Sequence, residues 1–197
     1  MVFDLGNVLI DWNPRHLYRR HFPDDDAGME AFLATVCPPS FNDELDAGRP
    51  FAEAVAERAA RFPDHAPLIE LWQRDWEQML GDPIEASVEI LADLRAGGVP
   101  RYALSNWSAE TFPIARDRFA FLGWFDGIVI SGEVGCIKPD PAIFAALAER
   151  FGLTPATTVF VDDNHVNVEG GRQLGFDAVL FTTPDQLRAD LVARGLL

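Results

Sequence analysis

The spacing of apolar residues along the chain changes character twice. A short apolar run at residues 2–5 is closed by Gly6-Asn7, which is typical of a buried strand followed by a turn. A second short apolar run follows at residues 8–10. From residue 13 to about residue 81, apolar residues recur at helical spacing between proline and glycine breaks, as in segment 51–61. This pattern predicts a small all-helical insertion over residues 13–80, whose last helix would run over residues 67–80.

After residue 83 the pattern alternates between predicted helices and predicted strands. Helices are expected at residues 84–96, 107–119, 141–151, 164–174 and 184–194, and strands at residues 102–104, 127–130, 157–161 and 177–181. Strands that alternate with helices form a parallel sheet covered on both faces. The predicted fold class is therefore α/β, with residues 1–12 and 81–197 as the core domain and the helical segment inserted into it.

Length and charge narrow the classes of function. The chain has 197 residues, which suits one α/β domain with a modest insertion. Its formal net charge of −15 would repel nucleic acid over most of the surface, so no nucleic-acid partner is expected. A small anion can still bind where local donors or a metal outweigh that field. We therefore expect a small phosphorylated metabolite as the partner, and a monomer or homodimer.

Apolar runs, the N-terminal residues and the cysteines bear on where the protein resides in the cell and on its covalent links. No apolar run approaches the ~18 residues that a membrane span needs, and no basic leader precedes the first strand, so a cytoplasmic protein without membrane association is expected. Cys37 and Cys136 give neither a disulfide framework nor a zinc ligand set. Strands usually run to about five or six residues, whereas three residues precede Asp4, which favours a short native extension before Met1.

Polar side chains stand where predicted strands end. Asp4 follows the first strand, Ser105-Asn106 and Asp162-Asp163 follow two others, and Lys138 lies a little beyond the end of strand 127–130. In an open α/β sheet the carboxyl ends of the strands line the ligand crevice, so these groups can converge although they are far apart in sequence.

Taken singly, most of these residues have an ordinary explanation. Asp4, Ser105 and Asn106 would each be a turn residue or a helix cap, and Lys138 a solvated lysine. Asp162-Asp163 is less ordinary, because two adjacent carboxylates after a buried strand repel each other and a divalent cation would compensate them. Jointly, the residues predict one site.

Four motifs in order resemble those of the haloacid dehalogenase (HAD) superfamily, in the branch with a small helical cap after the first motif. They are Phe3-Asp4-Leu5-Gly6-Asn7-Val8-Leu9, Leu104-Ser105-Asn106, Ser131-Gly132-Glu133-Val134-Gly135 with Lys138-Pro139, and Phe160-Val161-Asp162-Asp163-Asn164 with Asn167-Val168-Glu169-Gly170. The resemblance covers essentially the whole chain. It implies a Rossmann-like, doubly wound parallel sheet with an inserted helical cap.

The resemblance also implies roles for the site residues. Asp4 would attack phosphorus and form an aspartyl-phosphate. Ser105 and the backbone region of Asn106 would bind phosphate oxygens, and Lys138 would neutralise both Asp4 and the phosphate. Mg²⁺ would be held by Asp4, the carbonyl of Gly6 and Asp163, with help from Asp162, since hard oxygen ligands favour magnesium. The implied activity is a phosphatase acting on a small phosphate ester.

One position departs from the family pattern. Most phosphatases of the superfamily carry an Asp two residues after the nucleophile as general acid and base, and here that position is Gly6. Three interpretations stay open: the leaving group needs little protonation, another residue such as His165 or a cap residue serves, or the reaction is not phosphate hydrolysis. The Asp-Leu-Gly-Asn-Val stretch resembles the bacterial α-D-glucose-1-phosphate phosphatase type, which favours the first, with a sugar phosphate as substrate.

Two alternatives come from other classes. A 2-haloacid dehalogenase attacks carbon with its Asp and needs no metal, but Asp162-Asp163 argues for phosphate and Mg²⁺. A catalytically weak phosphate-binding protein on the same fold would explain Gly6, but the retained Asp4, Lys138 and Asp163 speak against it. From the insertion boundary, Trp12 is a candidate to stack on a sugar ring or to pack between cap and core.

Overall fold

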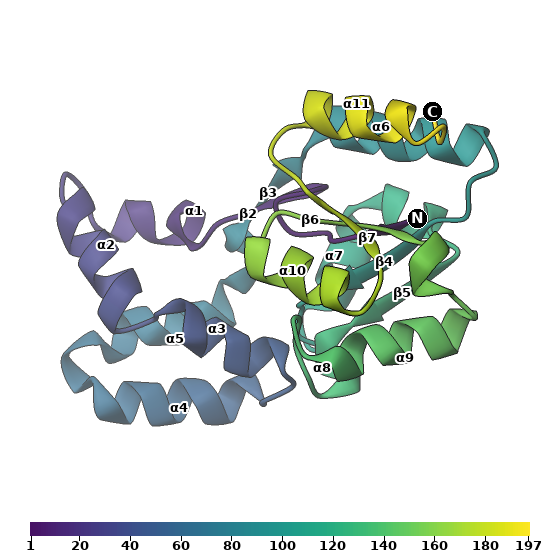
Figure 1. The fold of residues 1–197 in the computed structure, drawn as a ribbon. Helices are drawn as coiled ribbons and strands as arrows, with labels where there is room; N and C mark the ends of the chain where they lie inside the picture. Colours follow the sequence, from purple (N-terminus) through teal and green to yellow (C-terminus); the bar gives the residue numbers. More distant parts are fainter.

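A computed structural model describes the whole chain, Met1–Leu197. Its main sheet has five parallel strands in the order β5-β4-β1-β6-β7 (Figure 1). The strands are β1 (Val2–Phe3), β4 (Tyr102–Ser105), β5 (Gly127–Ile130), β6 (Val159–Asp162) and β7 (Asp177–Leu180). The first strand lies at the centre and the chain extends the sheet on both sides of it. The predicted doubly wound α/β fold is confirmed. In such sheets a ligand binds at the carboxyl ends of the strands, beside the strand from which the chain extends the sheet in both directions.

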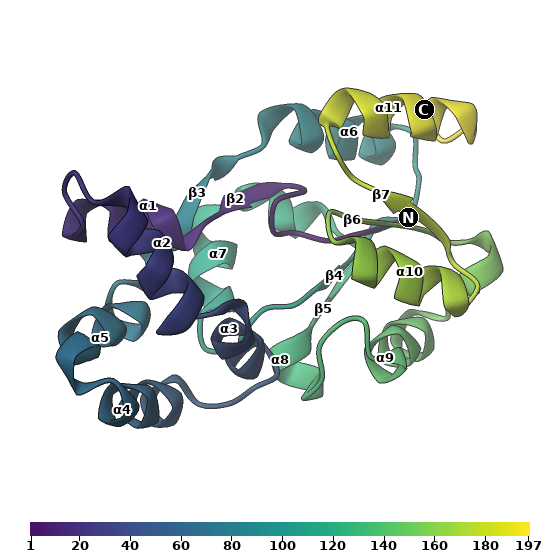
Figure 2. The same ribbon diagram turned by 60° about the vertical axis from the view of Figure 1, so that its left-hand side comes forward.

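Helices cover both faces of the sheet because its strands are apolar on both sides (Figure 2). One face carries α6 (Glu85–Ala96), α7 (Phe112–Arg118) and α11 (Pro184–Ala193), and the other carries α9 (Pro141–Phe151) and α10 (His165–Gln173). Val2 packs in the buried cluster of α9 and α10, whereas Phe3 packs in that of α6 and α11. Successive residues of a strand point to opposite faces, so even this short β1 joins both halves of the core.

The segment between β2 (Ile10–Trp12) and β3 (Leu80–Pro83) is entirely helical, and these two strands pair antiparallel at its base. Its helices are α1 (Pro14–Tyr18), α2 (Asp26–Thr35), α3 (Pro39–Asp46), α4 (Phe51–Arg61) and α5 (Ala66–Arg74), with 3₁₀ turns η1 (Arg19–His21), η2 (Pro63–His65) and η3 (Trp76–Met79). We call residues 13–80 the cap segment. Figure 1 shows it beside the sheet, with α3 against α8 (Ser131–Val134), the short helix after β5.

Two predicted helices have different bounds in the structure. The helix predicted over residues 107–119 begins only at Phe112, because Pro113 fits the first turn of a helix, whereas farther inside it would clash with the carbonyl four residues earlier. The helix predicted over residues 67–80 ends at Arg74, and Leu80 instead begins β3, where it pairs with Trp12. Two 3₁₀ turns, η4 (Ala120–Trp124) and η5 (Pro155–Thr157), complete the chain. None of the helices has both the length and the apolar composition needed to cross a bilayer.

Candidate active site

Three neighbouring strands, β4, β1 and β6, deliver polar side chains to the same edge of the sheet. Ser105 and Asp162 are the last residues of their strands and Asp4 follows directly after β1. A cavity of about 220 Å³ opens there. Of the residues predicted to form a site, all but Asp162 line it: Asp4, Gly6, Trp12, Ser105, Asn106, Lys138 and Asp163. The topology therefore brings together residues that are up to 159 positions apart (4 to 163).

Asp4 is buried and held on one carboxylate oxygen by two donors. The Ser105 hydroxyl donates to Asp4 Oδ1 at 2.8 Å, and the Lys138 ammonium lies 2.9 Å from the same atom. Its own amide donates to the carbonyl of Val161 at 2.8 Å, which fixes the backbone beside β6. Burial raises the pKa of Asp4 to about 7, against the opposing effect of Lys138. The second oxygen has no donor from the protein within hydrogen-bond distance, so it is available for chemistry.

Lys138 is the only lysine of the chain, and its ammonium is fully enclosed. It donates to Asp162 Oδ2 at 2.6 Å and to the Leu104 carbonyl at 2.8 Å, and Asp4 is its third partner. Burial disfavours the charged form, but the two carboxylates outweigh burial and raise the pKa of Lys138. A compact ammonium with three donors suits three acceptors around one point, whereas the planar guanidinium of arginine would not.

Asn106 fixes the backbone of Lys138 by two reciprocal hydrogen bonds. Its Nδ2 donates to the Lys138 carbonyl at 3.1 Å, and its Oδ1 accepts from the Lys138 amide at 2.7 Å. The side chain of Asn106 is therefore committed to positioning the lysine. What remains to bind an anion is its backbone, and that role stays a prediction.

The two adjacent carboxylates differ sharply in environment. Asp162 is fully buried, and both of its oxygens accept hydrogen bonds, from Lys138, from the Asn164 amide at 2.8 Å and from Asn167 Nδ2 at 3.1 and 3.2 Å. Asp163 is more exposed and lines the cavity. Burial, then the Asp162 charge, raises the pKa of Asp163. Oxygens of these two residues and of Asp4 lie within 4.8 Å of one another.

This donor set fits a hard divalent cation. Carboxylate oxygens are the ligands that Mg²⁺ prefers, and no softer sulfur or imidazole ligand belongs to the cluster. Because both oxygens of Asp162 already accept hydrogen bonds, Asp4 and Asp163 are the carboxylates best placed to bind a cation, while Asp162 holds Lys138. Asn7, whose positive φ of 53° closes the turn after Gly6, opposes the rise in the pKa of Asp163 through its side chain.

Gly6 lines the cavity without offering a side chain, and the structure leaves room for one. A Cβ built on Gly6 would meet nothing within 4 Å, and its φ lies outside the left-handed region. We expect Gly6→Ala to raise the free energy of unfolding by about 0.4–1 kcal/mol, because alanine restricts the unfolded chain at a conformation it can adopt. Urea unfolding of both proteins measures this change; a loss of stability would show that the turn requires glycine.

The cap segment contributes cavity residues that sequence reasoning did not identify as functional. Asn42, Asp46 and Trp76 line the cavity opposite the core residues, and Trp107 does so from the core. Asp46 is an acid in an amphipathic helix and gives no signal in the sequence that separates it from a solvated residue. Trp76 is buried, yet it also lines the cavity. His165, which the sequence left open beside a cap residue as a substitute acid but did not favour, does not line this cavity.

Comparison with known proteins matches most of the chain to one family. The family described as haloacid dehalogenase-like hydrolase matches residues 1–175. Drimenol cyclase drtB of Aspergillus calidoustus is 36% identical over 196 residues, which cover 97% of this chain but 35% of that protein. Phosphoserine phosphatase of Thermus thermophilus is 29% identical over 160 residues, covering 78% of this chain and 63% of the other. The chain thus spans about a third of one relative and less than two thirds of the other.

A solved structure has the same fold at low identity. An HAD family enzyme of Bacteroides thetaiotaomicron, in complex with magnesium and inorganic phosphate, superposes with a TM-score of 0.67 at 20% identity, covering 92% of each chain.

Proposed function

Because the chain belongs to the haloacid dehalogenase-like hydrolases, we propose that it is a Mg²⁺-dependent phosphatase acting on a small phosphate ester through an aspartyl-phosphate on Asp4. The observation that carries this proposal is the enclosure of Asp4. One of its oxygens is held by Ser105 and Lys138, and Asp163 stands beside it in the same cavity. The phosphatase among the relatives, and the magnesium and phosphate bound by the Bacteroides enzyme, support the same chemistry.

Asp4, Asp163 and the carbonyl of Gly6 would hold the Mg²⁺ ion, and Asp162 would assist by fixing Lys138. When bound, the ion supplies positive charge that offsets the repulsion between a carboxylate and an anionic substrate.

The protein groups divide the remaining work. Lys138 and Ser105 orient the nucleophilic carboxylate, since both bind its Oδ1. In the first step the other oxygen of Asp4 bonds to phosphorus while the bond from phosphorus to the alcohol oxygen breaks. In the second step water attacks phosphorus, and phosphate leaves with Asp4 regenerated. The ammonium of Lys138 and the amide region of Asn106 neutralise charge on the transferring group.

The substrate class follows from the size of the cavity and from charge. A cavity of about 220 Å³ accommodates a phosphoryl group and the first atoms of its leaving group. The net charge of −15 disfavours polyanionic substrates, so a small phosphorylated metabolite is the class that fits, with sugar phosphates among its members.

A phosphate-release screen over small phosphate esters, with and without Mg²⁺, tests the proposal. We expect release only with the metal, loss of at least about 100-fold on EDTA treatment, since the ion carries several kcal/mol of charge stabilisation, and recovery on adding excess Mg²⁺. Short 2-haloacids serve as the control substrates, because a dehalogenase of this fold would act on them without metal.

Two results would contradict the proposal. Halide release that survives EDTA would assign the chain to the dehalogenases. Binding of inorganic phosphate with Mg²⁺ but no turnover of any ester would leave a phosphate-binding protein.

A further inference from the structure

The proposed reaction needs a general acid for the leaving group, and no residue has yet been assigned to it. An alcohol oxygen that departs from phosphorus needs a proton, and general acid catalysis contributes typically ~10²–10⁴-fold. The core side of the cavity leaves no carboxyl for this purpose. Gly6 has no side chain and the oxygens of Asp162 are occupied, while Asp4 and Asp163 are assigned to the nucleophile and the metal. A donor must therefore come from another wall of the cavity.

Asp46, the last residue of α3, is an acid on the opposite wall. It lines the same cavity as Asp4, and its Oδ2 accepts a hydrogen bond from Asn42 Nδ2 at 2.7 Å. Its backbone is anchored to the core, because the Ser131 hydroxyl donates to the Asp46 carbonyl at 2.6 Å while accepting from the Trp107 amide at 2.8 Å. The carboxyl is thus placed by both halves of the molecule.

The direction of the reaction points to the same wall. The attacking and leaving oxygens lie roughly in line across phosphorus, so a leaving group faces away from Asp4 and towards the cap segment. There a second cavity of about 390 Å³, lined by Leu33 and Trp72 among others, shares Trp12 and Asn42 with the first. A leaving group that extends into it passes Asn42, the hydrogen-bond partner of Asp46.

Given the proposed phosphatase function, we propose that Asp46 of the cap segment is the general acid and base that Gly6 cannot supply. In the first step the Asp46 carboxyl gives its proton to the alcohol oxygen as the phosphorus–oxygen bond breaks and Asp4 becomes phosphorylated. In the second step the Asp46 carboxylate takes a proton from the water that attacks phosphorus. Phosphate and the Asp4 carboxylate are released, and Asp46 ends protonated as it began.

The electrostatic setting suits both steps. Burial, then the Asp43 charge, raises the pKa of Asp46 to about 7, while the Ser108 amide and Asn42 oppose the rise and Asp4 adds to it. An acid with such a pKa is present in both protonation states near neutral pH, as alternating acid and base work requires. Lys138 and Asp163 also line this cavity. Two helices pack against α3: α4 carries Glu53, Glu57, Arg58 and Arg61, and α8 carries Glu133, which pairs with Arg150.

Asp46→Asn with two aryl substrates tests the proposal. Phenyl phosphate has a basic leaving oxygen and p-nitrophenyl phosphate a weakly basic one. We expect kcat/KM for phenyl phosphate to fall by about 10²-fold or more, and that for p-nitrophenyl phosphate by less than about tenfold. The wild-type kcat/KM for phenyl phosphate should decline above pH 7 as Asp46 loses its proton, and the variant should lack this decline. Asp46→Ala, measured in the same way, should show the same unequal loss of kcat/KM for the two substrates.

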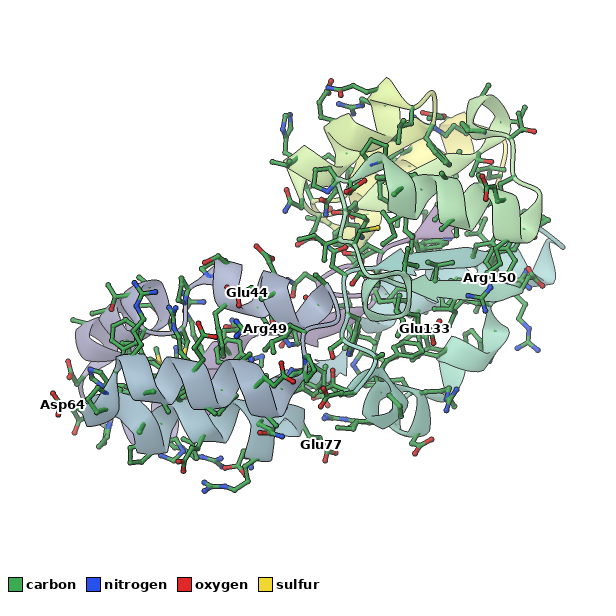
Figure 3. All side chains as sticks on the ribbon, turned by 90° about the horizontal axis from the view of Figure 1, so that it is seen from below. Glu44, Arg49, Asp64, Glu77, Glu133 and Arg150 are labelled. Carbon is green, nitrogen blue, oxygen red and sulfur yellow. The ribbon has the colours of Figure 1, made fainter.

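Glu44→Gln is the matched control. Glu44 lies on the same helix, pairs with Arg49 and lines neither cavity (Figure 3). It should leave both substrates and the pH profile unchanged. Retained turnover of p-nitrophenyl phosphate by Asp46→Asn shows that the variant is folded. If Asp46→Asn lowers kcat/KM equally for both substrates, or still shows the decline above pH 7, the role of Asp46 is wrong while the proposed function stands. No phosphate release by the wild-type enzyme from any ester would overturn the proposed function, and this proposal with it.

Discussion

Asp4→Asn is expected to abolish turnover, lowering kcat by at least about 10⁴-fold, the order of loss that follows removal of a nucleophile. An amide oxygen is too weak a nucleophile to attack phosphorus, and no second carboxylate in the cavity is held by Ser105 and Lys138 in the same way. Phosphate release from the best substrate of the screen measures the loss.

The same substitution should leave the fold intact, with a specific change in its pH dependence. The folded pKa of Asp4, raised by burial to about 7, lies above its unfolded value of 3.8. Between these values the native state binds more protons than the unfolded state, so Asp4 makes the free energy of unfolding fall as pH rises. Without added metal, Asp4→Asn should therefore show a flatter dependence between pH 4 and 7 in urea unfolding.

Asp93→Asn is the control for this variant, since Asp93 lies on α6 and pairs with Arg188 outside the cavity. It should match the wild type in turnover. Turnover within tenfold of wild type by a folded Asp4→Asn protein would remove Asp4 from the mechanism.

The sequence predicts the core of this protein well because the information is local. Strand 127–130 and helix 141–151 have the same bounds in the structure as in the pattern of apolar residues. Asp4, Ser105 and Lys138 could be found because parallel strands deliver their carboxyl ends to one edge, so a position after a strand is already a position in space. Two predicted bounds were wrong. Pro113 makes one helix begin at Phe112, and pairing with Trp12 places Leu80 in a strand.

The cap wall of the site could not be predicted in this way. Asn42 and Asp46 lie four positions apart in a helix whose exposed acids, Asp43 and Glu44, look the same in the sequence. What separates Asp46 from them is the contact of its backbone with Ser131 in the core. That contact depends on how the cap segment lies against the sheet, which no local pattern encodes. The opposite roles of Asp162 and Asp163 have the same origin, since burial and the positions of Lys138 and Asn167 distinguish the two carboxylates.

Lys138→Met is expected to remove activity and to destabilise the protein by about 3–5 kcal/mol. Methionine replaces the apolar stem of the lysine but leaves Asp4 and Asp162 without the ammonium that binds them at 2.9 and 2.6 Å. Two carboxylates would then stand in a buried space with no counter-charge, and removing one partner of a buried ion pair costs far more than the pair contributes. The nucleophile would also lose the donor that orients it.

The pH dependence separates this explanation from a simple packing defect. Lys138 lowers the pKa of Asp4, so its removal moves that pKa above about 7. The folded variant then takes up a proton that the unfolded chain does not hold, and its free energy of unfolding falls as pH rises from 5 to 8. In urea unfolding without metal, the variant should lose more free energy of unfolding relative to wild type at pH 8 than at pH 5.

Arg101→Met is the control: Arg101 is a buried cation outside the cavity, so its loss should lower stability but not turnover. If the loss of unfolding free energy in Lys138→Met does not change with pH, Lys138 stabilises the fold by packing. Its charge would then have no part in stabilising Asp4 and Asp162.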